Sequence, residues 1–361
     1  MILPDETPAP SVLVPLLWKE GRLLILDQRL LPGTEQHGEA RDAEAVVRAI
    51  VQMQLRGAPL IGVAAAYGVA LEARRLLDGL PLADFHDRMR QALTRLLSCR
   101  PTAINLMRAL APAGQWLEQK MDPRDFALRS EAWAHGLAQR EAQACDVMGR
   151  LGADRLASGS RILTHCNTGR LATVGAGTAL AVVREAVRRD PACQVTCTET
   201  RPWLQGARLT AYELSREGIP VDLVTESVAG NRLLDQAIDF FIVGADRISP
   251  DGRVANKVGT RMLAQLARTG GARTLVVAPT TTIDWEWKPG QSIPIERRGG
   301  EELWHATGMA EIPPGIHIDN PVFDLTPPAL IDWIVTEKGV IEPARGECFD
   351  PGRFSSPEPD C

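Results

Sequence analysis

The sequence predicts an α/β protein in which a small, mainly helical N-terminal domain with a short β start precedes a Rossmann-like parallel-sheet domain. From Asp42 to about residue 150, apolar residues recur at helical spacing, and Ala, Leu, Arg and Glu dominate. Beyond that point, short β-rich runs alternate with helical stretches. A chain of 361 residues is long enough for two such parts. We therefore predict domains at 1–150 and 151–361.

The N-terminal part opens on a short hairpin region and continues as a series of helices. Residues 22–33, "RLLILDQRLLPG", form an apolar run that is interrupted by Asp-Gln and closed by Pro-Gly, which is typical of a hairpin. Stretches with helical periodicity follow in this order: 42–54, 62–77, 83–98, 102–119 and 125–156.

The C-terminal part contains short runs rich in β-branched and apolar residues. Their starts are roughly 20 to 35 residues apart, which is the length that a strand, a crossover helix and two loops require. This spacing predicts a parallel sheet with helices on both faces. The runs are 161–166 "RILTHC", 193–199 "CQVTCTE", 220–226 "PVDLVTE", 239–246 "DFFIVGAD" and 273–280 "RTLVVAPT".

Charge and cysteine content limit the classes of protein that fit. A formal net charge of -5 and a pI near 5.8 argue against a nucleic-acid binder or a binder of acidic membranes, whose surfaces are usually basic. The sequence has neither a signal-peptide pattern nor an apolar run long enough to span a membrane, so we expect a cytoplasmic protein. Seven scattered cysteines fit a reducing compartment, and the lone pair Cys193 and Cys197 lacks the further ligands of a zinc site.

Two residues that end predicted strands are candidates for chemistry. Ligands of open parallel sheets bind outside the carboxyl ends of the strands. Cys166 ends the run at 161–166, and Asp246 ends the run at 239–246. A buried cysteine that only packs, and an aspartate that only caps a helix, are the alternatives for these residues.

The segment 166–189, "CNTGRLATVGAGTALAVVREAVRR", predicts a glycine-containing loop followed by an amphipathic helix. The start of such a helix favours a phosphate. Gly175 and Gly177 form GxG, but Leu180 stands where a dinucleotide fingerprint requires its third glycine. The segment is therefore either a phosphate loop or a place where glycines permit close packing.

Further residues suit a phosphorylated, hydroxyl-rich ligand. Arg56 and Arg100 lie beside Gly or Pro, where a guanidinium can present two donors to a phosphate. Gln205, Asn256 and Lys257 offer amide and ammonium groups from predicted loops. All five also fit ordinary surface positions.

Taken together, several motifs closely resemble one known family. In chain order they include "RGAPLIGVAAAYG", "RPTAINL", "THCNTG", "TRPWLQGARLTAYEL", "GADRI", "ANKVGT" and "NPVFDLTPPALI". This combination is similar to the methylthioribose-1-phosphate isomerase family, which is related to the α, β and δ subunits of translation initiation factor 2B. The resemblance covers nearly the whole chain.

The resemblance implies an activity and a set of site residues. The implied reaction is the isomerisation of 5-methylthio-α-D-ribose 1-phosphate to 5-methylthio-D-ribulose 1-phosphate in methionine salvage, by a homodimer with no metal or organic cofactor. By motif, the catalytic residues fall on Cys166 and Asp246. The substrate-binding residues fall on Arg56, Gly57, Ala58, Arg100, Gln205, Asn256 and Lys257.

One departure from the family pattern bears on the substrate. This chain reads "CNTGRLAT" where members of the family often read "CNAGALAT", so Arg170 adds a cation close to the proposed phosphate loop. A related ribose-1,5-bisphosphate isomerase therefore stays an alternative. A noncatalytic regulatory subunit of the initiation-factor type is a second alternative, but we expect such a subunit to lack the pair Cys166 and Asp246.

Overall fold

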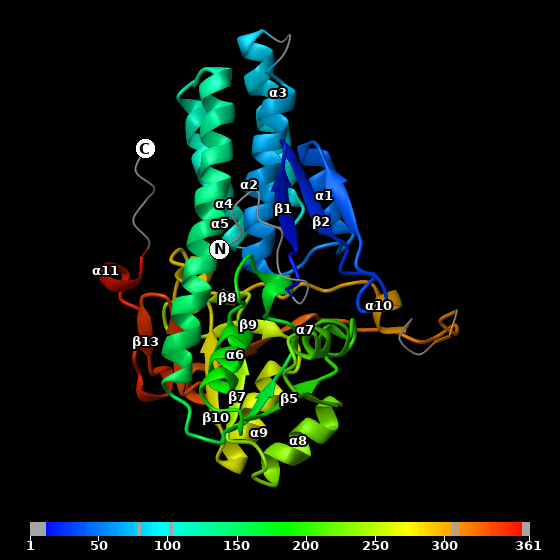
Figure 1. Ribbon diagram of the computed structural model, residues 1–361, viewed down its shortest axis with the longest axis vertical. Coiled ribbons are helices and arrows are strands. Elements are labelled where there is room, and N and C mark those ends of the chain that lie inside the picture. The colour runs from blue at the N-terminus through cyan, green and yellow to red at the C-terminus, as the bar shows by residue number, and fades with distance from the viewer. Residues whose placement is uncertain (1–11, 78–80, 101–103, 305–307, 310, 356–361) are drawn as a thin grey trace. The chain divides into compact units, whose positions relative to one another are not determined.

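A computed structural model describes residues 12–77, 81–100, 104–304, 308–309 and 311–355 (Figure 1). The chain folds into two compact units. The first unit contains the residues up to Asp146 together with Gly169–Gly177, and the second contains Val147–Thr168 and Thr178–Ser355. The division falls inside a helix, between Asp146 and Val147. The boundary predicted from the sequence is four residues later, after residue 150.

The first unit opens on an antiparallel sheet of β1 (Leu16–Lys19), β2 (Arg22–Leu26) and β3 (His37–Ala40), in that order among the described residues. The prediction of a hairpin within 22–33 is wrong in its second arm. Asp27 accepts hydrogen bonds from the backbone N–H and the guanidinium of Arg29, which turns the chain immediately after β2. The strands that pair with β2 therefore lie before and after the predicted segment.

The predicted helical stretches of the first unit are confirmed as helices, except for residues 102–103, which lie outside the described residues. One of these helices forms the centre of the unit. α2 is buried from Ala58 to Ala73, because its many small residues let neighbouring helices approach closely. It packs against α1, α3 and α4. The helices are α1 (Ala43–Val51), α2 (Ala58–Arg75), α3 (Leu82–Ser98), α4 (Ile104–Glu118) and α5 (Pro123–Ala153), the last of which continues into the second unit.

The second unit is built on a mainly parallel sheet. Among the described residues this sheet has seven strands in the order β13-β12-β10-β7-β4-β5-β6, and only the edge strand β13 is antiparallel to its neighbour. The five predicted runs are five of these strands. The bounds are β4 (Arg161–Thr164), β5 (Gln194–Thr198), β6 (Asp222–Val224), β7 (Phe240–Val243), β10 (Arg273–Val277), β12 (Trp333–Thr336) and β13 (Gly339–Ile341).

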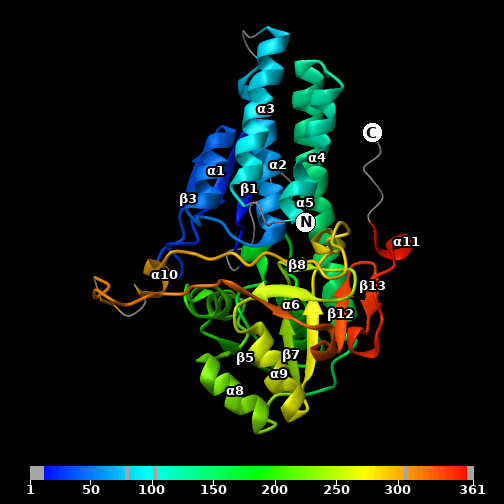
Figure 2. The same cartoon turned by 180° about the vertical axis from the view of Figure 1, so that it is seen from behind.

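Helices cover both faces of this sheet. α6 lies on one face (Figure 1), whereas α8 and α9 pack together on the other, against β5, β7 and β10 (Figure 2). Leu163, Phe241, Val243 and Val276 of the central strands are buried among these elements. The helices of the unit are α6 (Ala179–Arg189), α7 (Ala211–Arg216), α8 (Glu226–Leu234), α9 (Thr260–Gly270), α10 (Gly300–Trp304) and α11 (Pro351–Phe354).

A smaller antiparallel sheet comes after β7 in the chain. It contains β8 (Arg247–Ile248), β9 (Val254–Lys257) and β11 (Phe323–Thr326), in the order β11-β9-β8 among the described residues. In the large sheet, successive strands run outward from β4 to β6, and the chain then returns to place β7 on the other side of β4. The pair β4 and β7 is therefore the switch point at which ligands of open α/β sheets bind.

No helix among the described residues is both long enough and apolar enough to cross a membrane.

Candidate active site

Cys166 lies at the carboxyl edge of the large sheet, just after β4, and its backbone is tightly held. Its φ of 67° is in the left-handed region, which a residue with a side chain adopts at a cost. Its N–H donates to Thr200 Oγ1 at 2.8 Å, and its carbonyl accepts from Thr210 Oγ1 at 2.6 Å. These two hydroxyls stabilise the conformation that the backbone of Cys166 requires.

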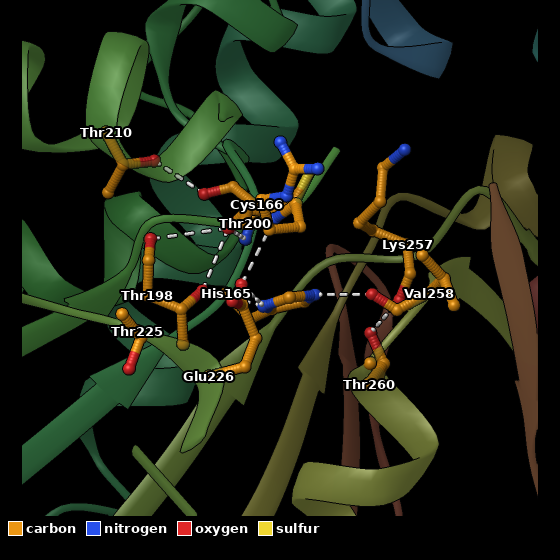
Figure 3. Close-up of polar contacts among 12 residues, drawn as sticks. His165, Cys166, Thr198, Thr200, Thr210, Thr225, Glu226, Lys257, Val258 and Thr260 are labelled. Carbon is orange, nitrogen blue, oxygen red and sulfur yellow. Dashed lines mark hydrogen bonds and ion pairs between the residues drawn. The ribbon is translucent and has the colours of Figure 1, made fainter. Parts of the chain in front are cut away.

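His165 precedes the cysteine and is fully buried. Its Nδ1 lies 2.7 Å from Thr198 Oγ1 and its Nε2 lies 2.9 Å from the carbonyl oxygen of Val258. Burial lowers the pKa of His165 to about 4, although the bond to Val258 and the charge of Glu226 act in the opposite direction. The ring is therefore neutral at physiological pH. Figure 3 shows it between the Cys166 segment and the Lys257–Val258 segment.

Asp246 lies just after β7, the strand beside β4. The interpretation of this residue as a helix cap is wrong, because the chain continues into the β8–β9 hairpin instead of a helix. Its N–H donates to the carbonyl of Ala255 on β9 at 2.9 Å, which fixes its backbone to that hairpin. Asp246 thus lies at the carboxyl edge of the sheet, and a strand instead of a helix follows it.

Lys257 links the two candidate catalytic residues electrostatically. The side chain is 3% exposed, and its pKa is lowered, chiefly by burial and also by the charge of Arg298. Electrostatic interactions with Cys166, Asp246 and Glu302 act in the opposite direction and raise this pKa. The structure therefore brings Cys166, Asp246 and Lys257 into one electrostatic cluster.

Asn256 neighbours Lys257 on β9, so the two side chains point to opposite faces of the strand. Its Nδ2 donates to Thr260 Oγ1 at 3.0 Å, at the start of α9. In this structure Asn256 therefore ties β9 to α9.

Gln205 has a feature that points to a ligand. The residue is 2% exposed, and its Oε1 is buried with no hydrogen-bond partner among the described residues. Buried polar atoms are almost always paired, so an unpaired one calls for an absent partner. Gly206, the next residue, leaves no room for a side chain, because a Cβ there would lie 1.7 Å from the carbonyl oxygen of Thr198.

Four of the predicted site residues belong to the first unit and are described within it. Gly57 has a φ of 104° and precedes α2, of which Ala58 is the first residue. A Cβ on Gly57 would lie 2.5 Å from the Cα of Ala172, so only glycine permits this approach. Arg56 beside it is 8% exposed, and Arg100 comes after α3 and is partly buried.

The loop before α6 fits the packing interpretation better than a phosphate site. A Cβ on Gly175 would lie 2.8 Å from the Cα of Ala142 on α5. Within the second unit, the N–H of Leu180 near the start of α6 donates to the carbonyl of Thr168. The N–H of Ala181 donates to the carbonyl of Thr178. The amides of Leu180 and Ala181, two of those that a phosphate at this helix start would use, are thus already bonded.

The residues that sequence reasoning missed surround Cys166. They are His165, Thr198, Thr200 and Thr210. A usable signal was present for three of them, because His165 adjoins the cysteine and both Thr198 and Thr200 lie at the end of the next parallel strand, at the same edge of the sheet.

Comparison with known proteins shows the family of the chain. The initiation factor 2 subunit family matches residues 54–343. The methylthioribose-1-phosphate isomerase of Thioalkalivibrio sulfidiphilus is 46% identical over 327 residues, which are 91% of this chain and 93% of that protein. The enzyme of that name from Azotobacter vinelandii is 46% identical over 329 residues, covering 90% of this chain and 91% of the relative.

Two solved structures bear on the assignment. The 5-methylthioribose 1-phosphate isomerase of Pyrococcus horikoshii OT3 has a TM-score of 0.83 at 37% identity, covering 95% of this chain and 96% of that one. A structure described as translation initiation factor eIF-2B, subunit delta, from A. fulgidus has a TM-score of 0.79 at 37% identity, covering 92% and 96%. The chain belongs to the initiation factor 2 subunit family and, within it, to the methylthioribose-1-phosphate isomerases.

Proposed function

We propose that this protein is an aldose-ketose isomerase that converts 5-methylthio-α-D-ribose 1-phosphate to 5-methylthio-D-ribulose 1-phosphate. The observation that carries the proposal is the position of Cys166 and Asp246 after the two strands of the switch point, in one electrostatic cluster with Lys257. Relatives that carry the name of this isomerase and match nine-tenths of the chain support it. We further propose that it works in methionine salvage, in the cytoplasm, as a homodimer and without a cofactor.

The substrate explains why an acid and a base are required. A sugar phosphorylated on its anomeric carbon cannot open as a free sugar does, so the ring oxygen must receive a proton as its bond to C1 breaks. A hydrogen then moves from C2 to C1, and the C2 hydroxyl loses its proton to become the ketone. Asp246 is assigned this proton transfer, since a partly buried carboxyl group can act as both acid and base.

In this scheme, Cys166 and Lys257 interact with the charged groups of the substrate and of the reaction intermediates. The thiol polarises the reacting oxygens or stabilises the charge that develops on them, and the ammonium of Lys257 attracts anionic groups of the substrate. Gln205 supplies an amide oxygen that accepts a hydrogen bond from a substrate hydroxyl. Asn256 offers its amide, and Arg56 and Arg100 bind the phosphate. Gly57 and Ala58 complete the proposed substrate-binding set.

A coupled assay with purified protein tests the reaction. We expect turnover of methylthioribose 1-phosphate well above that of ribose 1,5-bisphosphate. Preference for the bisphosphate would replace the substrate and assign Arg170, which is partly buried, to the second phosphate. A folded protein that converts neither compound would contradict the proposal. That result would favour the regulatory-subunit alternative, because the A. fulgidus structure that resembles this chain is described as an initiation-factor subunit.

A further inference from the structure

The hydrogen bonds around His165 have a fixed direction. The carbonyl of Val258 can only accept, so His165 Nε2 carries a hydrogen and donates to it. Because the buried ring is neutral, its Nδ1 has a lone pair and accepts from the hydroxyl of Thr198.

The same donor-to-acceptor order extends from Thr198 through Thr200 to Cys166. The hydroxyl of Thr198 has given its hydrogen to His165, so its oxygen accepts from Thr200 Oγ1 at 2.8 Å. The oxygen of Thr200 accepts in turn from the N–H of Cys166. Four hydrogen bonds thus run in one sense from the Cys166 backbone to the Val258 carbonyl, and bonds in such a chain strengthen one another (Figure 3).

The far end of this chain is the segment that carries Lys257. The ring of His165 packs against Gly259, where a Cβ would lie 3.1 Å from Nε2 and where φ is 103°. The N–H of Gly259 donates to Asp324, and the carbonyl of Lys257 accepts from Thr260. The backbone after Lys257 is therefore held between His165 and Asp324.

We infer that His165 is a positioning residue that, through Thr198 and Thr200, sets the spacing between the thiol of Cys166 and the ammonium of Lys257. The charged groups that face His165 are Glu226, whose Oε1 lies 4.0 Å from Nδ1, and Lys257. His165 itself stays uncharged and transfers no proton. The effect of this spacing on turnover rests on the proposed function. The effect of His165 on the spacing is independent of that function.

Variants of His165 and Thr198 distinguish the effect of the hydrogen bonds from the effect of the volume of the histidine ring. His165→Phe keeps a ring but removes both bonds, and His165→Gln keeps one donor and one acceptor. Thr198→Val breaks the chain at one hydroxyl. Thr196→Val is its matched control, because Thr196 lies on the same strand and is also buried, but its oxygen accepts from Arg232.

Alkylation of Cys166 by iodoacetamide, followed by mass spectrometry across pH, needs no substrate. We expect His165→Phe and Thr198→Val to change the profile, with alkylation about threefold slower at pH 7, because the thiol no longer keeps its position relative to Lys257. Steady-state kinetics of the same variants should show kcat lowered about tenfold with KM within about twofold. His165→Gln should recover most of both effects, and Thr196→Val should match the wild type.

Unchanged alkylation profiles in both His165→Phe and Thr198→Val would overturn the inference, as would a Thr196→Val profile shifted as far as that of Thr198→Val. If His165→Phe does not fold, Thr198→Val alone decides. A wild-type protein that isomerises neither sugar phosphate would contradict the proposed function, but the alkylation comparison would still decide whether His165 positions Cys166.

Discussion

Cys166 and Asp246 lie just after β4 and β7, the two adjacent parallel strands between which the order of the sheet reverses. Helices cover the two faces of the sheet, so the carboxyl edge at this reversal is where a ligand can reach both residues. The thiol and the carboxylate come from segments some 80 residues apart in the sequence, yet both act electrostatically on Lys257.

Replacing Asp246 by Asn tests the role in proton transfer. We expect a melting temperature near that of the wild type, because no helix begins directly after Asp246 and Asn keeps the size of the side chain. Loss of a positioned acid and base should lower kcat by 10²-fold or more. Near-normal kcat in this variant would end the proposed mechanism.

Replacing Cys166 by Ser tests the thiol. Serine keeps nearly the same volume and can form the same backbone bonds to Thr200 and Thr210, so we expect the fold to persist. Turnover should fall severely, because the hydroxyl lacks the acidity and polarisability of the thiol. In the unmodified protein, substrate should protect Cys166 from alkylation, and protection of a different cysteine would count against the assignment.

Changes of Arg56, Arg100 or Lys257 to Ala test the anion-binding groups. Each should cost roughly 1.5 to 3 kcal/mol in kcat/KM, the size of a charge-assisted hydrogen bond. Steady-state kinetics on the three variants measure this, with Arg188→Ala as a control at an exposed residue that pairs only with Glu185 among the described contacts. Kinetics unchanged in all three would refute the binding role.

Replacement of Gln205 by Met tests the unpaired amide oxygen. Removing a buried polar atom that lacks a protein partner among the described residues should leave the melting temperature unchanged or slightly higher. In contrast, kcat/KM should fall about tenfold, because a hydrogen bond to the substrate is lost. A variant that is clearly destabilised but fully active would show that the amide serves the fold alone.

The buried histidine predicts how stability depends on pH. In the folded protein burial lowers the pKa of His165 from 6.5 to about 4, so between these values the unfolded chain binds the additional proton. The contribution of His165 is therefore fully present above pH 6.5 and is lost as pH falls towards 4, by up to the order of 3 kcal/mol. Urea unfolding across pH 4 to 7 should be less pH-dependent for His165→Gln, and equal slopes would contradict a buried neutral ring.

The sequence by itself determined the local elements and the position of two candidate catalytic residues at the ends of their strands. Short runs rich in apolar and β-branched residues and bounded by turns define β4 and β7, because strands buried on both faces of a parallel sheet need apolar residues at most positions. That rule placed Cys166 and Asp246 at the edge where ligands bind. The helices of the first unit result in the same way from their 3.6-residue periodicity.

Only the tertiary structure decided which strands are neighbours and which element comes after each of them. Strand order depends on pairing between distant segments, and this pairing makes β4 and β7 adjacent. After Asp246 the chain enters the β8–β9 hairpin instead of the helix that a capping aspartate would require. The burial of His165, the left-handed backbone of Cys166 and the unpaired oxygen of Gln205 among the described residues have the same origin. Each results from packing by residues that are remote in the sequence, and no local pattern encodes those contacts.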